Sequence, residues 1–334
     1  MKREARLHHA IGETRAGIHE SGKLVEVHIE RHSDRDLLHP GERWTGRVRR
    51  IEPSLGAAFI DLGTPTDGFL RFTTSPGAPR LTEGQLLDVT VARETEPGKG
   101  PLLTYAGKPT HDAPAVVTQL SFQDRLSARF PGIAFKDGRV PRLTDLVQRE
   151  LAIPGGGTVA IEPTRALVAV DVDKGSQVSG LKAGEAAASL IAQQLRLRGL
   201  GGLVCIDFPN LRQPKQRSAL EKAVARAFAD DPDNPKIAPL SRFGVVELTR
   251  TRRTRSLDHL LATTPTETAA LEALDQLLVE GKARPGAQLN LTVPTDIHAW
   301  LETTDLYWRD QLAERLGARS IVREGESISV EADR

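Results

Sequence analysis

The sequence predicts an α+β protein of several domains: an OB-type β-barrel, then an α/β domain, then a small α+β domain. The α/β prediction comes from residues 166–208, where two short apolar runs, ALVAVDV and LVCIDF, flank an Ala-rich stretch of helical periodicity. Residues 40–107 contain about five short strand-like runs between Pro and Gly turns, which is typical of an OB-type barrel. The tail indicates strand, helix, helix, strand and strand in that order.

Two carboxylates are expected to meet in the α/β domain. A strand–helix–strand crossover makes its two strands parallel, so their carboxyl ends lie at one edge of the sheet. Asp171 and Asp207 lie near those two ends. Converging carboxylates need a cation or a raised pKa on one of them, and a bound Mg²⁺ is the simplest solution. The alternative is that aspartates at strand ends serve as turn or cap residues, with Asp173 and Ser176 capping the following helix.

Composition excludes several classes of protein. The 334 residues include 45 basic and 44 acidic side chains, so a nucleic-acid binder of this charge needs its basic residues clustered locally. The single cysteine, Cys205, excludes an internal disulfide and a Cys-based zinc site. Without a membrane-length apolar run, and with an N-terminal MKREARLHHA that lacks the apolar core of a signal peptide, we expect a cytoplasmic protein with no membrane partner.

The basic residues do cluster around the predicted α/β domain. Arg196 and Arg198 end its helix, and the run SRFGVVELTRTRRTRSL adds Arg250, Arg252 and Arg253. Next to a carboxylate pair, this pattern favours a track for RNA phosphates. The alternative is a solvated charge run whose Arg stems cover apolar surface.

Four stretches resemble one known family. DVDKG, the QLRLR-x-LGGL-x-x-IDF run and SRFGVVELTRTRRTRSL follow one another as in the catalytic core of the ribonuclease E/G family, and RIEPSLGAAFIDLGTPTDGFLRF is similar to its RNA-binding barrel. The resemblance implies a DNase I-like catalytic domain and a Mg²⁺-dependent endoribonuclease that prefers single-stranded RNA and leaves a 5′-phosphate. It covers nearly the whole chain except residues 108–157.

The same resemblance assigns roles to individual residues. Asp171 and Asp207 match the family's metal-binding aspartates, and Phe59, Phe69 and Lys99 match barrel residues that stack bases and contact phosphates. From the sequence alone, both phenylalanines are equally well explained as core residues. Relatives carry Asn where this chain has Asp173, and the extra negative charge could either tighten metal binding or repel the scissile phosphate.

Two family features are expected to be missing. Only about fifty residues lie between the barrel and the catalytic core, too few for the family's separate domain that senses the RNA 5′ end. We therefore expect a shortened RNase H-like/5′-sensor region, with one or two helices such as 144–151, and no preference for 5′-monophosphorylated RNA. The family's zinc link needs cysteines that this region lacks, so a homodimer would form without zinc.

These observations predict six segments: a β-hairpin that packs on the catalytic region (1–35), the barrel (36–107), the connector (108–157), the catalytic metal-binding domain (158–258), a linker helix (259–284) and the small C-terminal domain (285–334). The favoured function is endoribonucleolytic cleavage of single-stranded RNA in rRNA or mRNA processing or decay. The alternatives are a non-catalytic RNA-binding or ribosome-associated protein, and hydrolysis of another phosphodiester by the same metal chemistry.

Overall fold

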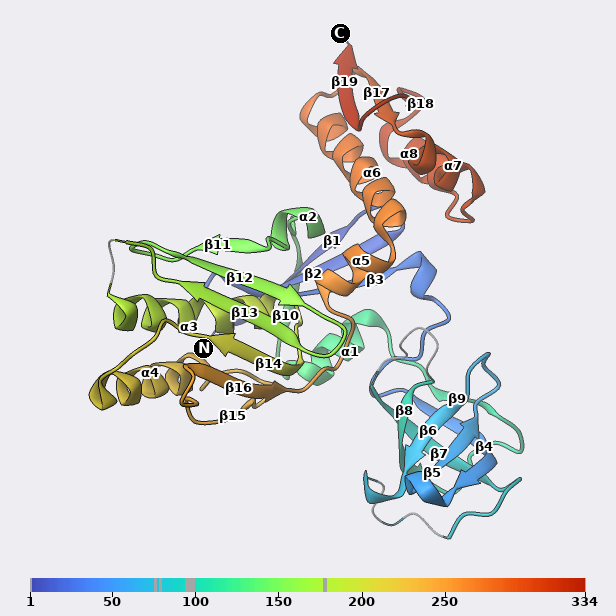
Figure 1. Ribbon diagram of the computed structural model, residues 1–334. Helices are drawn as coiled ribbons and strands as arrows, with labels where there is room; N and C mark the ends of the chain where they lie inside the picture. Colours follow the sequence, from blue (N-terminus) through green and yellow to red (C-terminus); the bar gives the residue numbers. More distant parts are fainter. Residues whose placement is uncertain (1, 75–76, 78–79, 94–99, 177–178, 334) are drawn as a thin grey trace. The chain divides into compact units, whose positions relative to one another are not determined.

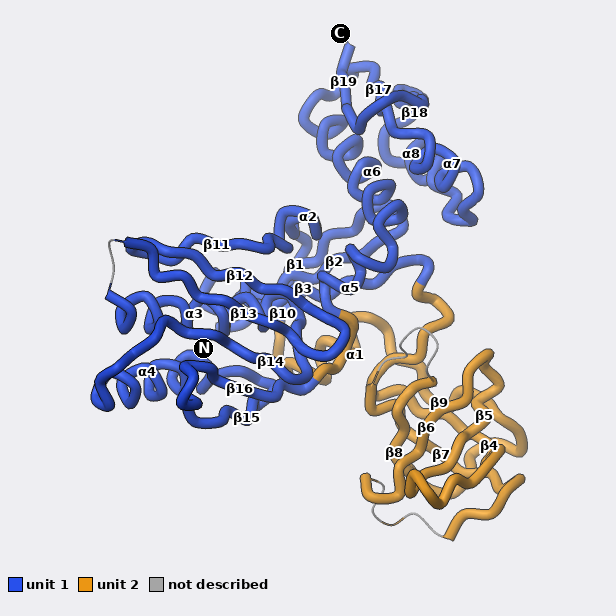
Figure 2. The backbone as a smooth tube through the Cα atoms, in the orientation of Figure 1, with its two compact units in different colours: residues 1–33, 134–251, 256–334 blue, residues 34–133, 252–255 orange. Residues whose placement is uncertain are grey.

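Strands and helices are mixed along the whole chain, which confirms the α+β prediction (Figure 1). The computed structural model describes residues 2–74, 77, 80–93, 100–176 and 179–333. These residues form two compact units (Figure 2). One unit comprises residues 1–33, 134–251 and 256–334, and the other comprises residues 34–133 and 252–255. No helix in the described ranges is long and apolar enough to cross a membrane.

The second unit is built around a closed barrel. Its sheet runs β5-β6-β8-β7-β4, and a further pairing of β5 with β4 closes the ring, giving a five-stranded, OB-like barrel. Buried aliphatic side chains such as Ile60 and Leu103 fill its interior. β9 adds to the outside of β4. The elements of this unit are β4 (Arg43–Glu52), β5 (Ala57–Asp61), β6 (Gly68–Arg71), β7 (Leu86–Arg93), β8 (Leu102–Gly107), β9 (Ala115–Thr118), α1 (Phe122–Arg129) and the short helices η2 (Pro53–Leu55) and η3 (Phe72–Thr74); η1 (His32–Asp34) precedes them.

A six-stranded sheet is the largest element of the first unit. Its order is β11-β12-β13-β14-β16-β15, and β13 and β14 are its parallel pair, joined by the crossover helix α3. Helices α3 and α4 pack on one face, where Ala187 and Ile191 of α3 meet Val170 and Ile206 of the strands. The elements are β11 (Glu150–Ala152), β12 (Thr158–Pro163), β13 (Val168–Asp173), α3 (Gly180–Leu197), β14 (Gly202–Asp207), α4 (Pro214–Ala227), β15 (Lys236–Ile237) and β16 (Val245–Arg250).

The N-terminal strands form more than a hairpin. β1 (Arg3–His9), β2 (Glu13–Glu20) and β3 (Lys23–Arg31) pair in sequence, and β10 (Ala134–Asp137) adds in parallel to β1. Connector strands thus join three different sheets: β9 the barrel, β10 this sheet and β11 the six-stranded sheet. The expected helix over 144–151 is wrong, because α2 (Leu143–Leu146) ends early and Glu150–Ala152 pairs with β12 instead. Strand pairing outweighs local helical propensity there.

The C-terminal part contains the five expected elements in order: β17 (Gln288–Val293), α7 (Thr295–Thr303), α8 (Trp308–Leu316), β18 (Ser320–Glu324) and β19 (Ser329–Asp333). The predicted linker segment 259–284 contains the end of α5 (Leu257–Thr263) and the whole of α6 (Pro265–Ala283), with a break between them. Pro265 causes the break, because proline has no N–H to continue the α5 hydrogen bonds. α6 contacts the N-terminal sheet through Asp275, which accepts hydrogen bonds from His8 at 2.7 Å and from Arg15.

Candidate metal centre and RNA-contacting residues

Asp171 and Asp207 lie side by side on the parallel strands β13 and β14. They are direct partners in the strand register, and both side chains are exposed. Alternation along each strand explains their exposure: Val170 and Ile206 point into the core beneath α3, so the residues that follow them point to the opposite face. Strand order and register therefore bring together the two aspartates that the sequence suggested, on the face that the helices leave uncovered.

Asp173 lies on the same face, two residues after Asp171. Its Oδ1 accepts a hydrogen bond from the backbone N–H of Gly175 at 3.0 Å, and its backbone pairs with Thr158 of β12. The proposed cap by Asp173 or Ser176 is wrong, because the Ser179 side chain caps α3 by accepting a hydrogen bond from the Lys182 N–H. Asp173 therefore remains beside the aspartate pair.

The chemistry of this donor set suits Mg²⁺. Carboxylate oxygens are its preferred protein ligands, and Mg²⁺ commonly keeps several waters while binding through one or two carboxylates. Among the described residues there is no group of three His, Cys, Asp or Glu side chains placed to hold a metal together. Cys205 lies near the pair on β14, but burial and the charge of Glu247 raise the pKa of its thiol, which keeps it protonated and a poor ligand. The two aspartates fit a hydrated ion better than a closed protein cage.

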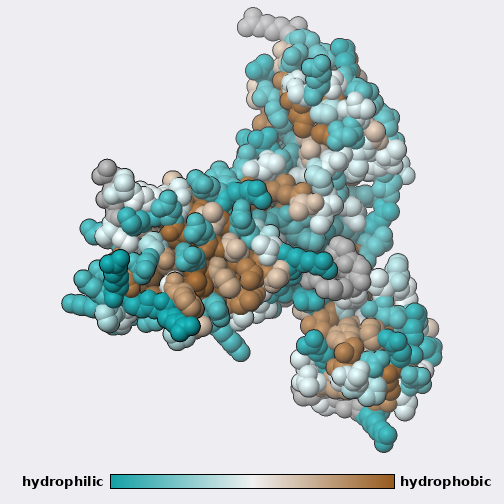
Figure 3. Space-filling view, viewed as in Figure 1, coloured by the Kyte–Doolittle hydropathy of each residue, from teal (hydrophilic) through white to brown (hydrophobic). Residues whose placement is uncertain are grey.

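The uncovered face around these carboxylates carries apolar residues as well as charged ones such as Glu247. Figure 3 shows hydrophobic residues over the strands of this sheet. Leu203 is exposed, and Ala169 and Cys205 are half-buried on the same face.

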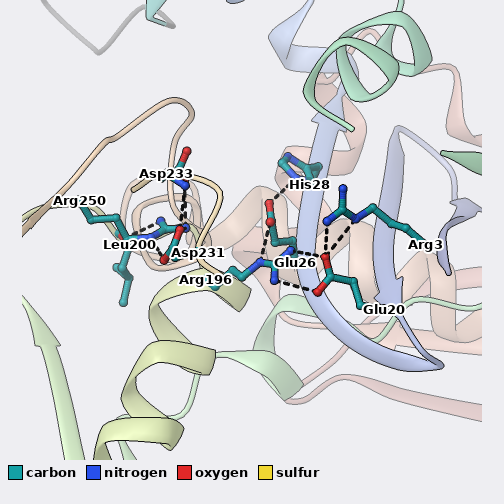
Figure 4. A network of polar contacts seen from close by, with 9 residues as sticks. All are labelled: Arg3, Glu20, Glu26, His28, Arg196, Leu200, Asp231, Asp233 and Arg250. Carbon is teal, nitrogen blue, oxygen red and sulfur yellow. Dashed lines mark hydrogen bonds and ion pairs between the residues drawn. The ribbon is translucent and has the colours of Figure 1, made fainter. Parts of the chain in front are cut away.

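Arg196 is occupied by protein carboxylates. Its Nη1 and Nη2 donate to Glu20 at 3.0 and 2.8 Å, and its Nε donates to Glu26 at 2.8 Å (Figure 4). This network joins α3 to strands β2 and β3, and it raises the pKa of Arg196, because the hydrogen bonds outweigh the opposing effect of burial. The prediction that Arg196 contacts RNA phosphates is therefore not supported, since the guanidinium already has two anionic partners.

The prediction that Arg198 and Arg250 contact RNA phosphates is not supported either. Arg198 is fully buried and pairs with Asp258, while Arg250 donates to Asp231 at 2.8 Å and pairs with Asp233 at 2.9 Å (Figure 4). Buried Arg residues require such partners, because an unpaired charge in the interior is costly. Sequence spacing did not distinguish these structural arginines from surface ones. Arg252 and Arg253 are exposed, as a phosphate contact requires.

The barrel brings the two predicted aromatic residues together. Phe59 and Phe69 are register partners on β5 and β6, and their rings pack edge to face with centroids 5.4 Å apart. Each ring also has a guanidinium near it, Arg50 at 4.7 Å from the Phe59 centroid and Arg71 at 5.8 Å from that of Phe69. Lys99 lies outside the described residues.

A cavity of about 750 Å³ lies beside Phe59 within the barrel unit. Arg49, Arg50, Phe59, Thr66, Asp67, Glu83 and Gly100 line it. Both phenylalanines are half-buried, so each combines packing with an accessible ring face. Arg49 and Arg50 were not predicted from the sequence. The basic run RVRR in β4, which pairs with the apolar AAFI run of β5, could have indicated them.

Comparison with known families identifies part of the chain. The family model described as "Ribonuclease E/G family" matches residues 135–253, from β10 to just beyond β16. That segment carries Asp171, Asp173 and Asp207. This segment is therefore similar to the ribonuclease E/G family. This match confirms, over residues 135–253, the resemblance that the sequence motifs indicated.

Curated proteins named ribonuclease E or ribonuclease E/G-like are similar to about a third of this chain or slightly more. Ribonuclease E of Escherichia coli (strain K12) is 38% identical over 117 residues, which are 33% of this chain and 11% of the relative. Ribonuclease E of Synechocystis is 34% identical over 142 residues, or 40% of this chain and 21% of the relative. The chloroplastic ribonuclease E/G-like protein of Arabidopsis thaliana is 30% identical over 126 residues, covering 35% and 13%. The matches thus span about a fifth or less of these relatives.

Proposed function

We propose that this protein is a Mg²⁺-dependent endoribonuclease that cleaves single-stranded RNA. The observation that carries the proposal is the opposition of Asp171 and Asp207 in the register of β13 and β14, within the segment that matches the ribonuclease E/G family. A non-catalytic RNA-binding protein would have no use for two exposed carboxylates beside each other, because they repel each other and the RNA phosphates.

We assign metal binding and RNA binding to different regions of the protein. Asp171 and Asp207 would hold Mg²⁺, with Asp173 beside them. When bound, the ion would position a water and offset negative charge on the phosphate. In the barrel, Phe59 and Phe69 offer ring faces to unpaired bases, and Arg50 and Arg71 add positive charge beside them. Arg252 and Arg253 would contact phosphates.

The substrate range follows from the connector. Residues 108–157 contribute one strand to each of three sheets, so they do not form a separate domain of the kind that senses an RNA 5′ end. This arrangement supports cleavage that does not depend on a 5′-monophosphate. We further propose that the substrates are rRNA precursors or mRNA in the cytoplasm, that the products carry 5′-phosphates, and that any homodimer forms without zinc, since Cys205 is the only cysteine of this chain.

Cleavage of a fluorescent A/U-rich single-stranded RNA tests the proposal. The wild type should cut it with Mg²⁺ and not with EDTA, and Asp171→Asn or Asp207→Asn should abolish cutting without loss of thermal stability, because both side chains are exposed. Glu162→Gln is the matched control: it removes an exposed carboxylate from β12, two residues beyond the partner of Asp171. This variant should keep full activity.

Two further comparisons make the outcome decisive. Substrates with a 5′-hydroxyl and a 5′-monophosphate should be cut at equal rates. Tight RNA binding without metal-dependent cutting would overturn the enzyme proposal and favour an RNA-binding protein. Inhibition by unlabelled RNA separates an RNase from an enzyme that acts on another phosphodiester.

A further inference from the structure

The turn before β16 holds an aromatic side chain out in solvent. Phe243 is 76% exposed, the highest value among the exposed large hydrophobic residues of the described chain. The guanidinium of Arg242 lies over its ring, 4.7 Å from the centroid. A phenylalanine in this position exposes apolar surface to water, so its ring is available for a partner with a flat apolar face.

The turn itself is rigid. The Ser241 N–H donates to the Val245 carbonyl at 2.9 Å, and the Gly244 N–H donates to the Ser241 carbonyl at 3.0 Å. The Ser241 hydroxyl oxygen accepts from the N–H groups of Phe243 at 3.3 Å and Val245 at 3.2 Å. Gly244 has φ +92°, a conformation that other residues rarely adopt.

Helix α4 fixes the base of the turn. Arg217 donates from Nη2 to the carbonyls of Leu240 at 3.1 Å and Ser241 at 2.6 Å, and Glu221 accepts from the Leu240 N–H at 3.0 Å. The exposed ring is therefore carried on a backbone with little freedom. Because the position of the ring is fixed before binding, less conformational entropy is lost when a ligand stacks on it.

This turn lies next to the aspartate pair. Val245 is the register partner of Asp207, and the N–H of Phe208 donates to the Gly244 carbonyl at 3.3 Å. Two residues of extended chain plus one antiparallel step place the Cα of Phe243 within about 12 Å of the Cα of Asp207. That distance corresponds to a neighbouring nucleotide of an RNA whose phosphate lies at the carboxylates.

We propose that Phe243 is a stacking platform for an unpaired base adjacent to the phosphate at Asp171 and Asp207, with Arg242 offsetting charge on the flanking phosphate. The inference rests on the proposed ribonuclease function and names a further residue that selects its substrate. Stacking needs an unpaired base, so this platform would favour single strands at the point of cleavage itself, independently of the barrel.

Binding of RNA that carries 2-aminopurine tests the proposal, because stacking quenches the fluorescence of this base. In an Asp207→Asn background, which prevents cutting, the reporter base is moved along a short single-stranded RNA. Quenching at one position should fall in Phe243→Ala and persist in Phe243→Trp. With the active enzyme, Phe243→Ala should raise KM for RNA about tenfold and cause cleavage at several neighbouring positions instead of one. Tyr307→Asn is the control: it removes an equally exposed aromatic from a residue with positive φ, which Asn tolerates.

The outcomes separate the two proposals. Metal-dependent cutting by the wild type, with quenching, KM and cleavage position unchanged in Phe243→Ala, would overturn the stacking inference alone. A wild type that quenches the reporter through Phe243 but never cuts would support the platform and overturn the nuclease. Equal effects of Phe243→Ala and Tyr307→Asn would also overturn the inference, since they would indicate a general loss of exposed aromatic surface.

Discussion

Arg198 and Asp258 form a buried, bidentate ion pair that joins the end of α3 to the first turn of α5. The Arg198 Nε donates to one carboxylate oxygen at 3.0 Å, Nη2 donates to the other, and Nη1 donates to the Gln148 carbonyl at 3.1 Å. The guanidinium therefore links three segments of the first unit. The role of Arg198 is therefore structural: it donates hydrogen bonds to Asp258 and to the Gln148 carbonyl.

Breaking this pair should destabilise the protein. We expect Arg198→Met to lower the free energy of unfolding by about 3 to 5 kcal/mol, because Asp258 is left as a poorly solvated charge without its partner. The double variant Arg198→Met/Asp258→Leu should recover much of the loss. Urea unfolding measures both, and RNA affinity of the folded variants should stay unchanged. Wild-type stability with weakened RNA binding would restore the phosphate-contact interpretation.

Stability at low pH should depend on Glu20. The hydrogen bonds from Arg196 outweigh the effect of burial and hold the pKa of Glu20 below its ordinary value of 4.5. A lowered folded-state pKa stabilises the protein above the ordinary pKa, and that contribution is lost as the pH falls from there through the folded-state value.

Glu20→Gln should therefore lower the melting temperature at pH 7 and reduce its fall on acidification below about pH 4.5. Thermal unfolding at a series of pH values measures this. Glu326→Gln, at an exposed C-terminal position, should keep the wild-type profile. Parallel profiles for wild type and Glu20→Gln would show that the ion pair contributes nothing to acid stability.

Replacing Asp173 tests the role of its charge. Asp173→Asn is isosteric and keeps an oxygen to accept the hydrogen bond from Gly175. Removing one negative charge beside the aspartate pair should raise the Mg²⁺ concentration needed for half-maximal cleavage and lower KM for RNA, because repulsion of the phosphate decreases. Cleavage rates measured against Mg²⁺ concentration and against RNA concentration give the two values. Unchanged values would mean that Asp173 does not act on the ion or the substrate.

The barrel aromatics should contribute to RNA affinity rather than to cleavage. We expect Phe59→Ala or Phe69→Ala to weaken binding of single-stranded RNA about tenfold, and Phe59→Tyr to retain it, because any aromatic ring offers a stacking face. Fluorescence anisotropy measures the affinity. Leu55→Ser, at an exposed apolar residue of the same unit that does not line the cavity, is the control. Equal affinity of all four variants would identify the phenylalanines as core residues only.

The strand–helix–strand unit and the barrel could be predicted from sequence, because both are encoded locally. Short apolar runs between turn residues specify buried strands, and the parallel crossover follows from their order. The register that places Asp171 opposite Asp207 agrees with that prediction. By contrast, the helix expected over 144–151 fails, because pairing of Glu150–Ala152 with β12 depends on a distant strand.

The sequence by itself determined the resemblance of residues 135–253 to the ribonuclease E/G family, the mixed α+β class and the position of the aspartates at strand ends, since each depends on the order and spacing of nearby residues. Only the tertiary structure decided which arginines are buried and which are exposed. Arg196, Arg198 and Arg250 are buried or half-buried and pair with carboxylates that are distant in sequence or enclosed by the fold. Arg252 and Arg253 are exposed. Burial and ion pairing are properties of the folded chain, and charge clustering in the sequence does not report them.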